Sequence, residues 1–242
     1  MTAQPLIHTL SAHPLTPCRA VQALTAAAHP QTRNGQSGVL VQYLLQGDTP
    51  QLRIPPPVKR PEAADDLWRH TCFEAFIHRP GESGYREFNL SPSGQWAAYA
   101  FSDERVRHEP GVPTAPLAIA MSLSPQTLAL EAWLPLPEAL PGQTLKLGLS
   151  AVIETLGGCR TWSADSENGR QRGQFSRDLQ AHSLAMGQKD REKWTAAAHL
   201  QPAISKSDSL LEGHLSYWAL HHPDAKPDFH RKTGWTASFS TS

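Results

Sequence analysis

The segment Leu145-Lys146-Leu147-Gly148-Leu149-Ser150-Ala151-Val152-Ile153-Glu154 places an apolar side chain at every second position. In an extended chain alternate side chains point to opposite sides, so the odd-numbered residues form one apolar face. Lys146, Ser150 and Glu154 fall on the opposite face. An antiparallel sheet with one buried and one wetter face has this pattern. The segment therefore predicts a strand of such a sheet.

The same pattern of short extended segments continues on both sides of this strand. Residues 128–134 also alternate, and further strands are predicted at 39–45, 71–78, 85–90, 95–101, 116–123 and 215–221. Turn sequences such as Pro80-Gly81 and Ser91-Pro92-Ser93-Gly94 separate them, and the 21 prolines disfavour long helices. Seven or more short strands joined in this way indicate a mainly β protein, an antiparallel β-sandwich of the jelly-roll kind.

Residues 20–29 allow two interpretations. The segment is rich in alanine, which favours a helix. Val21, Ala23, Thr25 and Ala27 also alternate with Gln22 and Leu24, which fits a strand. Both remain open at this stage.

The length, charge and cysteine content limit the class of protein. The 242 residues suit one large β domain. Lysine plus arginine and aspartate plus glutamate number 22 each, so we expect no nucleic-acid partner. The three cysteines are widely spaced, which suits a reducing compartment. The chain starts without a signal-like segment and has no apolar run of about 18 residues, so we expect a cytoplasmic protein with no membrane partner.

Residues 163–213 differ from the rest of the chain because they contain few large apolar residues. Such a segment buries too little apolar surface to offset its ordering entropy. We expect a single domain over 1–242, interrupted at about 159–214 by a peripheral insertion that is polar and partly helical or disordered. Phe175, Leu179, His182 and Met186 have the spacing of one helical stripe within it.

Four stretches carry a resemblance to a known family: 67–77 (LWRHTCFEAFI), 85–99 (YREFNLSPSGQWAAY), 216–220 (SYWAL) and 226–230 (KPDFH). Together they resemble the bacterial DOMON-like domain proteins of unassigned function. That family is similar to the wider DOMON group and to the family-nine carbohydrate-binding modules, which are β-sandwiches whose ligands are haem or sugars. The resemblance implies the same fold and a small ligand, and it leaves the ligand class open.

Six residues in or near these stretches offer what a sugar site needs: Trp68, Glu74, Arg86, Asn89, Trp96 and Trp218. A sugar has apolar C–H faces and a rim of hydroxyls, so its site needs flat indoles and charged or amide groups. For Trp96 and Trp218 the alternative is core packing. Trp68 comes shortly before a strand, which fits a loop or rim.

Glu74 lies between Phe73 and Ala75 on an otherwise apolar strand. Burial of a lone carboxylate costs several kcal/mol. Its side chain is therefore expected to be solvated, to pair with Arg69 or Arg86, or to face a ligand.

Asp228 and His230 follow Pro227 and have two interpretations. They brace the turn through hydrogen bonds to the backbone, or they contribute to the rim of a ligand site. With His221 they also supply zinc-type ligands, although adjacent His221 and His222 point to opposite faces of an extended segment.

These patterns favour a non-catalytic module that binds a small molecule, most simply a sugar. We expect no cofactor; haem is the open alternative, although Met121 lies on an apolar strand and no histidine pair stands out. A second alternative is a protein-interaction domain, which requires Trp68 in an exposed apolar patch. A third is a hydrolase that uses Glu74 and Glu87 as acid and base across a cleft, or a metal enzyme at the histidine-rich C-terminal end. The chain lacks the common catalytic motifs.

Overall fold

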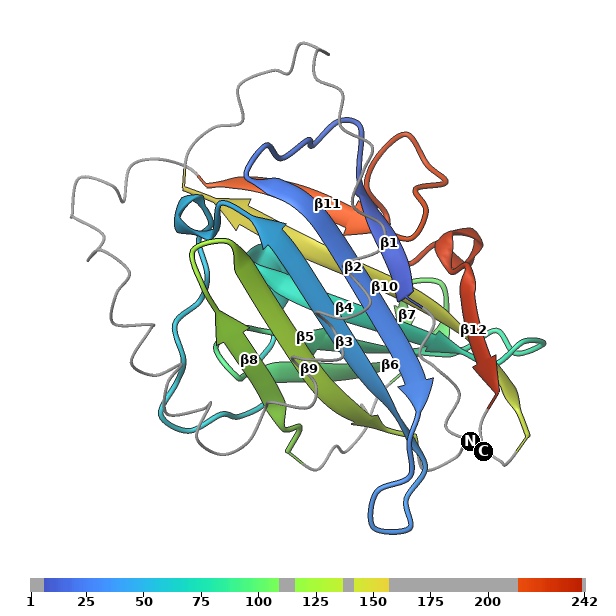
Figure 1. The fold of residues 1–242 in the computed structure, drawn as a ribbon. Coiled ribbons are helices and arrows are strands. Elements are labelled where there is room, and N and C mark those ends of the chain that lie inside the picture. The colour runs from blue at the N-terminus through green and yellow to red at the C-terminus, as the bar shows by residue number, and fades with distance from the viewer. Residues whose placement is uncertain (1–6, 109–115, 137–141, 157–212, 241–242) are drawn as a thin grey trace.

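The computed structural model describes residues 7–108, 116–136, 142–156 and 213–240 (Figure 1). The strands are β1 (Ile7–Ala12), β2 (Val21–Pro30), β3 (Gly38–Gly47), β4 (Cys72–His78), β5 (Tyr85–Leu90), β6 (Trp96–Asp103), β7 (Val106–Arg107), β8 (Ile119–Leu123), β9 (Thr127–Pro135), β10 (Thr144–Thr155), β11 (His214–Ala219) and β12 (Ala237–Ser240). Three short 3-10 helices, η1 (Thr49–Gln51), η2 (Leu67–Arg69) and η4 (Lys232–Gly234), complete the regular structure of these residues. None of these helices has the length and apolar character needed to cross a lipid bilayer.

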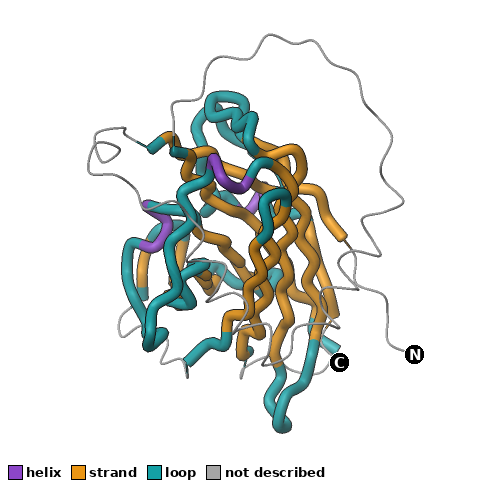
Figure 2. Tube along the Cα trace, turned by 60° about the vertical axis from the view of Figure 1, so that its left-hand side comes forward, coloured by secondary structure: helices purple, strands orange, loops and turns teal. Residues whose placement is uncertain are grey.

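The strands form two antiparallel layers that share β1 (Figures 1 and 2). The first layer has the order β1-β2-β3-β9-β8, and the second has the order β11-β10-β4-β5-β6-β7, with β12 also paired to β10. β1 joins the layers because Ile7 to Leu10 pair with β2, whereas Ser11 and Ala12 pair with β11. The predicted antiparallel β-sandwich is confirmed.

A single large core fills the space between the layers. It consists mainly of the alternate aliphatic and aromatic side chains that the two-residue period indicates, among them Leu45, Phe73, Leu130 and Leu149. Complete burial of each such side chain contributes roughly 1.5–3 kcal/mol. Tyr43 of the first layer packs on Phe73 and donates its hydroxyl hydrogen bond to the backbone oxygen of Glu74 at 2.7 Å. The polar tip of this core residue is thereby satisfied.

Most predicted strands occur with boundaries that differ by a few residues. The helical interpretation of residues 20–29 is wrong, since these residues form β2, which hydrogen-bonds to β1 and β3 on its two sides. Pairing on both edges overrides the helix propensity of alanine. β1, β7 and β12 were not predicted. The proposed insertion and its helix lie outside the described residues.

The C-terminal segment returns to the second layer after β11. η4 precedes β12, which pairs with the first part of β10 beside the end of β11. Trp235 lies directly against Gly148 of β10, and a Cβ atom at position 148 would collide with the indole. Glycine at 148 therefore allows the C-terminal segment to pack closely on the sheet.

Candidate functional site

Strand parity divides the predicted site residues between the two faces of the second layer. Glu74 lies opposite Asn89 in the pairing of β4 with β5, and Ile77 lies opposite Arg86. Ile77 belongs to the core between the layers. Side chains an odd number of positions apart on a strand face opposite sides, so Glu74 and Asn89 point away from the first layer. We call this side the outer face.

Glu74, Glu87 and Asn89 form a buried polar group on the outer face, which we call the central acidic cluster. Their exposed fractions are 3%, 5% and 0%. Nδ2 of Asn89 donates a hydrogen bond to Oε1 of Glu87 at 2.7 Å, and the hydroxyl of Ser150 donates to Oε2 of Glu74 at 3.4 Å. Oδ1 of Asn89 is buried and has no hydrogen-bond partner. The described residues thus supply fewer hydrogen-bond donors than the cluster has acceptors.

The two carboxyl groups of the cluster have raised pKa values. Burial raises the pKa of Glu74 well above its ordinary value, and the charge of Glu87 raises it further. Burial also raises the pKa of Glu87 to about 7, although the hydrogen bond from Asn89 and the charges of Arg107 and Arg105 oppose the rise. Near neutral pH the cluster therefore retains a proton that the unfolded chain would have released.

The C-terminal segment covers part of the outer face beside the cluster. The backbone N–H of His230 donates to Oδ1 of Asp228 at 3.0 Å, and Arg105 pairs with the same oxygen at 2.7 Å. Asp228 therefore braces the turn after Pro227, as one of the two sequence interpretations expects. His230 places Nε2 3.7 Å from Oε2 of Glu87, so this segment also reaches the cluster.

His230 is held neutral in a defined orientation. Burial, with a smaller effect from the charge of Arg105, lowers its pKa to about 4. The hydroxyl of Tyr85 accepts a hydrogen bond from the backbone N–H of Arg105 at 3.1 Å and lies 2.6 Å from Nδ1 of His230. Tyr85 therefore donates to Nδ1, which leaves the ring proton on Nε2, directed towards Glu87.

Another buried carboxylate on the outer face has its own nitrogen partners. Glu154 of β10 is 4% exposed. Nη1 of Arg53 lies 3.1 Å from its Oε1, and Nδ1 of His70 lies 2.8 Å from its Oε2. Each carboxylate oxygen thus has a nitrogen partner from the loop before β4.

The three tryptophans of the predicted site do not gather around the acidic residues. Trp96 and Trp218 face the core, where they end a cross-strand row through Leu90, Phe73 and Ala151. They are 4% and 7% exposed, and we therefore leave them out of the candidate site. The core-packing alternative holds because aromatic residues fill sandwich interiors.

Trp68 occupies a third location. It lies on η2 before β4 and is 43% exposed, with the Arg69 guanidinium 5.4 Å from its ring centre. It lines neither of the two hollows described below.

The described residues do not form the arrangement that a hydrolase or a metal enzyme needs. No group of three His, Cys, Asp or Glu residues in this part of the chain could hold a metal ion. Asp228 pairs with Arg105, and His230 bonds to Tyr85, so the metal set with His221 does not form. Glu74 and Glu87 lie on neighbouring strands of one face and do not oppose each other across a cleft.

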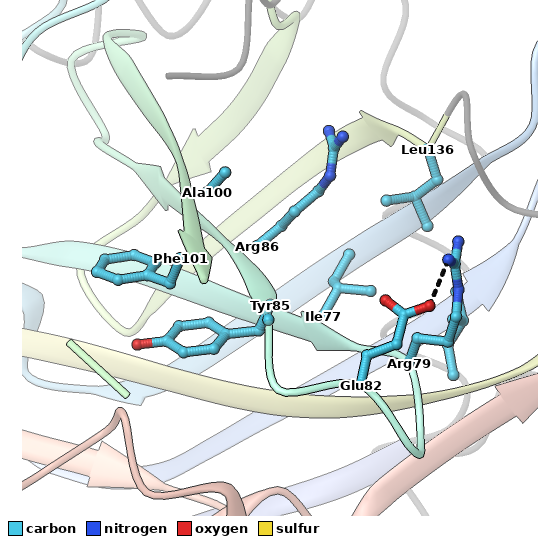
Figure 3. Close-up of a pocket in the computed structure, with 10 residues that line it drawn as sticks. Ile77, Arg79, Glu82, Tyr85, Arg86, Ala100, Phe101 and Leu136 are labelled. Atoms are coloured by element: carbon cyan, nitrogen blue, oxygen red, sulfur yellow. Dashed lines mark hydrogen bonds and ion pairs between the residues drawn. The ribbon is translucent and has the colours of Figure 1, made fainter. Parts of the chain in front are cut away.

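Two hollows lie on or beside the second layer. The smaller, of about 10 Å³, lies between Ser150 and Ala219 on the sheet and Phe229 and Trp235 of the C-terminal segment. This is room for about one water molecule. The larger, of about 230 Å³, lies at the end of the sandwich where β4 ends and β5 begins (Figure 3). We call it the end pocket.

The end pocket combines an apolar floor with charged walls. Its lining residues are Ile77, Arg79, Glu82, Gly84, Tyr85, Arg86, Ala100, Phe101, Leu136 and Leu145. Figure 3 shows Arg79 and Glu82, joined by an ion pair of 2.6 Å, beside Ile77, whereas the Tyr85 and Phe101 rings are directed away from Ile77 and Arg86. These two rings stack with centroids 4.6 Å apart and pack with Phe76 and Trp235 on the outer face. Arg86, predicted from sequence, belongs to this pocket and not to the central acidic cluster.

Sequence reasoning missed several contributors to both places. Tyr85, Glu87 and Asn89 share strand parity, which is a usable signal, but Glu87 was considered only as a catalytic acid. Ser150 joins Glu74 through the pairing of β10 with β4. That pairing connects segments far apart in the chain, so no local pattern indicates it.

Comparison with known proteins supports the fold. No family model matches the chain, and no curated protein matches it. A candidate carbohydrate-binding protein from Bacteroides uniformis has a similar structure, with a TM-score of 0.56 and 12% identity over 98% of this chain and 87% of that one.

A family 9 carbohydrate-binding module from Caldicellulosiruptor kristjanssonii was also found, in complex with cellotriose and with glucose. The TM-scores are 0.33 and 0.29, the identities 10% and 12%, and each match covers 59% of this chain and 65% or 66% of that one. These scores are too low to support an argument. The TM-score of 0.56 shows that the fold of this chain is similar to that of the Bacteroides protein.

Proposed function

We propose that this protein is a non-catalytic carbohydrate-binding domain and that its sugar lies in the end pocket. The observation that carries the proposal is the composition of this pocket. It offers an apolar floor, the guanidinium groups of Arg79 and Arg86 and the carboxylate of Glu82 within one hollow of about 230 Å³. Ligand pockets of drug-sized molecules span about 300–1,000 Å³, so this one suits roughly one sugar ring.

The chemistry of the lining fits a sugar. Apolar C–H faces pack against Ile77, Leu136 and Leu145, while hydroxyls accept or donate hydrogen bonds at Arg86 and Glu82. The DOMON-like resemblance and the similar fold of the Bacteroides uniformis protein support the same ligand class. Haem is the less favoured ligand, because its plane is far larger than this hollow.

Titration calorimetry of the full chain with neutral mono- and disaccharides tests the proposal. We expect binding of at least one sugar, and about tenfold weaker binding by Arg86→Ala, because charge-assisted hydrogen bonds are lost. Arg60→Ala is the matched control, since Arg60 is exposed and lies outside the pocket. Absence of binding across the panel would overturn the proposed function, and equal loss in both variants would overturn the proposed site.

A protein-interaction role is the second candidate. Trp68 is the exposed aromatic residue that this role requires. Arg69 lies over its ring, and a lone ring gives a much smaller apolar surface than a protein interface needs. The end pocket therefore carries the stronger argument.

A further inference from the structure

The central acidic cluster presents acceptors without matching donors. Within the described part of the chain, Glu74 accepts one long hydrogen bond from Ser150. Glu87 accepts from Asn89, whose other amide atom, Oδ1, is fully buried and unpartnered. Buried polar atoms are nearly always hydrogen-bonded, so each exception needs an explanation.

The nearby cations of the protein are committed elsewhere. Arg105 pairs with Asp228, and Arg107 lies 3.5 Å from Asp65 and over the ring of Tyr99. His230, the nearest basic side chain to Glu87, accepts at Nδ1 from Tyr85 and is neutral. No described cation contacts Glu74, in contrast to Glu154.

We propose that the central acidic cluster is a binding site for a primary ammonium group, with Glu74, Glu87 and Oδ1 of Asn89 as its three acceptors. Asn89 lies directly opposite Glu74 and bonds to Glu87, so its amide lies between the two carboxyl groups. A primary ammonium group carries three N–H donors and one positive charge, which matches three acceptors and a buried negative charge.

Close burial of the cluster selects a small head group, because Glu74, Glu87 and Asn89 are only 3%, 5% and 0% exposed. The hollow of about 10 Å³ reaches Ser150, which is hydrogen-bonded to Glu74, but none of the three acceptors lines it. A quaternary ammonium group is larger and has no N–H donors, so it cannot satisfy these acceptors. This site is separate from the end pocket and does not depend on sugar binding there.

Binding at this site is coupled to proton release. Without a cation the cluster retains a proton, and an ammonium group replaces that positive charge. The titratable or charged groups that face the cluster are Cys72 on β4, Tyr85 on β5, Tyr99 on β6, Arg105 and Arg107 at β7, Tyr217 on β11, and Asp228 and His230 of the C-terminal segment. Among these, His230 is already neutral at pH 7, so the carboxyl pair supplies the proton.

Calorimetry of the full chain with methylammonium chloride tests the proposal at pH 7.5. We expect saturable binding that weakens at least tenfold in Glu74→Gln and in Glu87→Gln. Parallel runs in phosphate and HEPES, which differ in ionisation enthalpy and carry no primary ammonium group, should show release of about one proton for each ligand bound. Glu62→Gln, at an exposed carboxylate, and Glu154→Gln, at the paired one, should leave the affinity unchanged.

Five further titrations separate the sources of the effect. Glucosamine and a lysine amide identify which carrier of the ammonium group the surroundings admit. Tetramethylammonium and potassium chloride should not bind, and N-acetylglucosamine should not bind at this site. Two results would overturn the proposal. One is binding of potassium or tetramethylammonium as tight as that of methylammonium, and the other is no binding of methylammonium at a 100-fold molar excess over the protein.

Discussion

Glu154 and Glu74 are both buried glutamates on the outer face of paired strands, but their surroundings differ. Glu154 has a nitrogen partner at each carboxylate oxygen, from Arg53 and His70. Glu74 has one hydroxyl donor and a second carboxyl group, Glu87, nearby. The first position is complete within the chain, whereas the second is stabilised by a retained proton or by a cation from outside.

This difference distinguishes a buried carboxylate that stabilises the fold from one that is available to a ligand. A buried ion pair with good geometry can hold a loop to a sheet, as the Arg53–Glu154 pair does for the chain before β4. A buried carboxyl pair without a cation lowers stability unless something else is gained. Binding sites are where proteins retain such groups.

The largest effect concerns the pH dependence of stability. Because the folded pKa of Glu87 is raised to about 7, the folded chain keeps a proton that the unfolded chain loses above about pH 4.5. Stability therefore falls as pH rises through this window. His230 acts oppositely below pH 6.5, because its folded pKa is lowered to about 4.

Urea denaturation at pH 5 to 8 measures this dependence. The Glu87→Gln variant should gain up to about 3 kcal/mol relative to the parent between these limits. Both proteins keep His230, so its effect cancels in the difference. Parallel profiles for the two proteins would contradict the prediction.

A second prediction compares the two glutamates directly. Glu154→Gln should lower the free energy of unfolding by about 2 kcal/mol at pH 8, because the charge-assisted hydrogen bonds to Arg53 and His70 are lost. Glu74→Gln should raise it by about 1 kcal/mol, because glutamine removes the cost of keeping this buried carboxyl group protonated at a pH where the unfolded chain releases the proton. Urea unfolding of both variants checks the opposite signs. Destabilisation of similar size in both would show that the positions are equivalent.

The smallest effect concerns the contact between β5 and the C-terminal segment. Tyr85→Phe removes the hydroxyl that bonds to His230 and accepts from the Arg105 backbone. We expect a loss of about 1 kcal/mol, which thermal unfolding can detect. NMR of the His230 ring should also show a changed tautomer population. An unchanged ring tautomer would mean that Tyr85 does not orient it.

The sequence predicts most strands of the fold because each buries one face. Alternation places β9 and β10 with few errors, and the turn residues mark their ends. β1 was missed because its pairing changes from β2 to β11 within six residues, which no local pattern reveals. The choice between helix and strand for β2 also depends on its pairing with β1 and β3, which the sequence does not show.

The candidate sites were less predictable than the fold. Glu74 and Asn89 were recognised as unusual residues, and the structure brings them together. Arg86 was grouped with them, although its strand parity places it on the other face, in the end pocket. The indoles of Trp96 and Trp218 were expected at the ligand, but they fill the core. Register and layer pairing, which the sequence does not contain, decide these assignments.

Carbon-13 NMR of the glutamate side-chain carboxyl groups, titrated from pH 4 to 9, tests the central contrast most directly. Glu74→Gln and Glu87→Gln assign the two resonances. In the parent protein we expect the Glu87 resonance to titrate with a pKa of about 7 and the pKa of Glu74 to lie well above its ordinary value. Both titrations should move to lower pH when methylammonium is added. If no glutamate resonance changes above pH 6, the central acidic cluster does not hold an unpaired carboxyl pair.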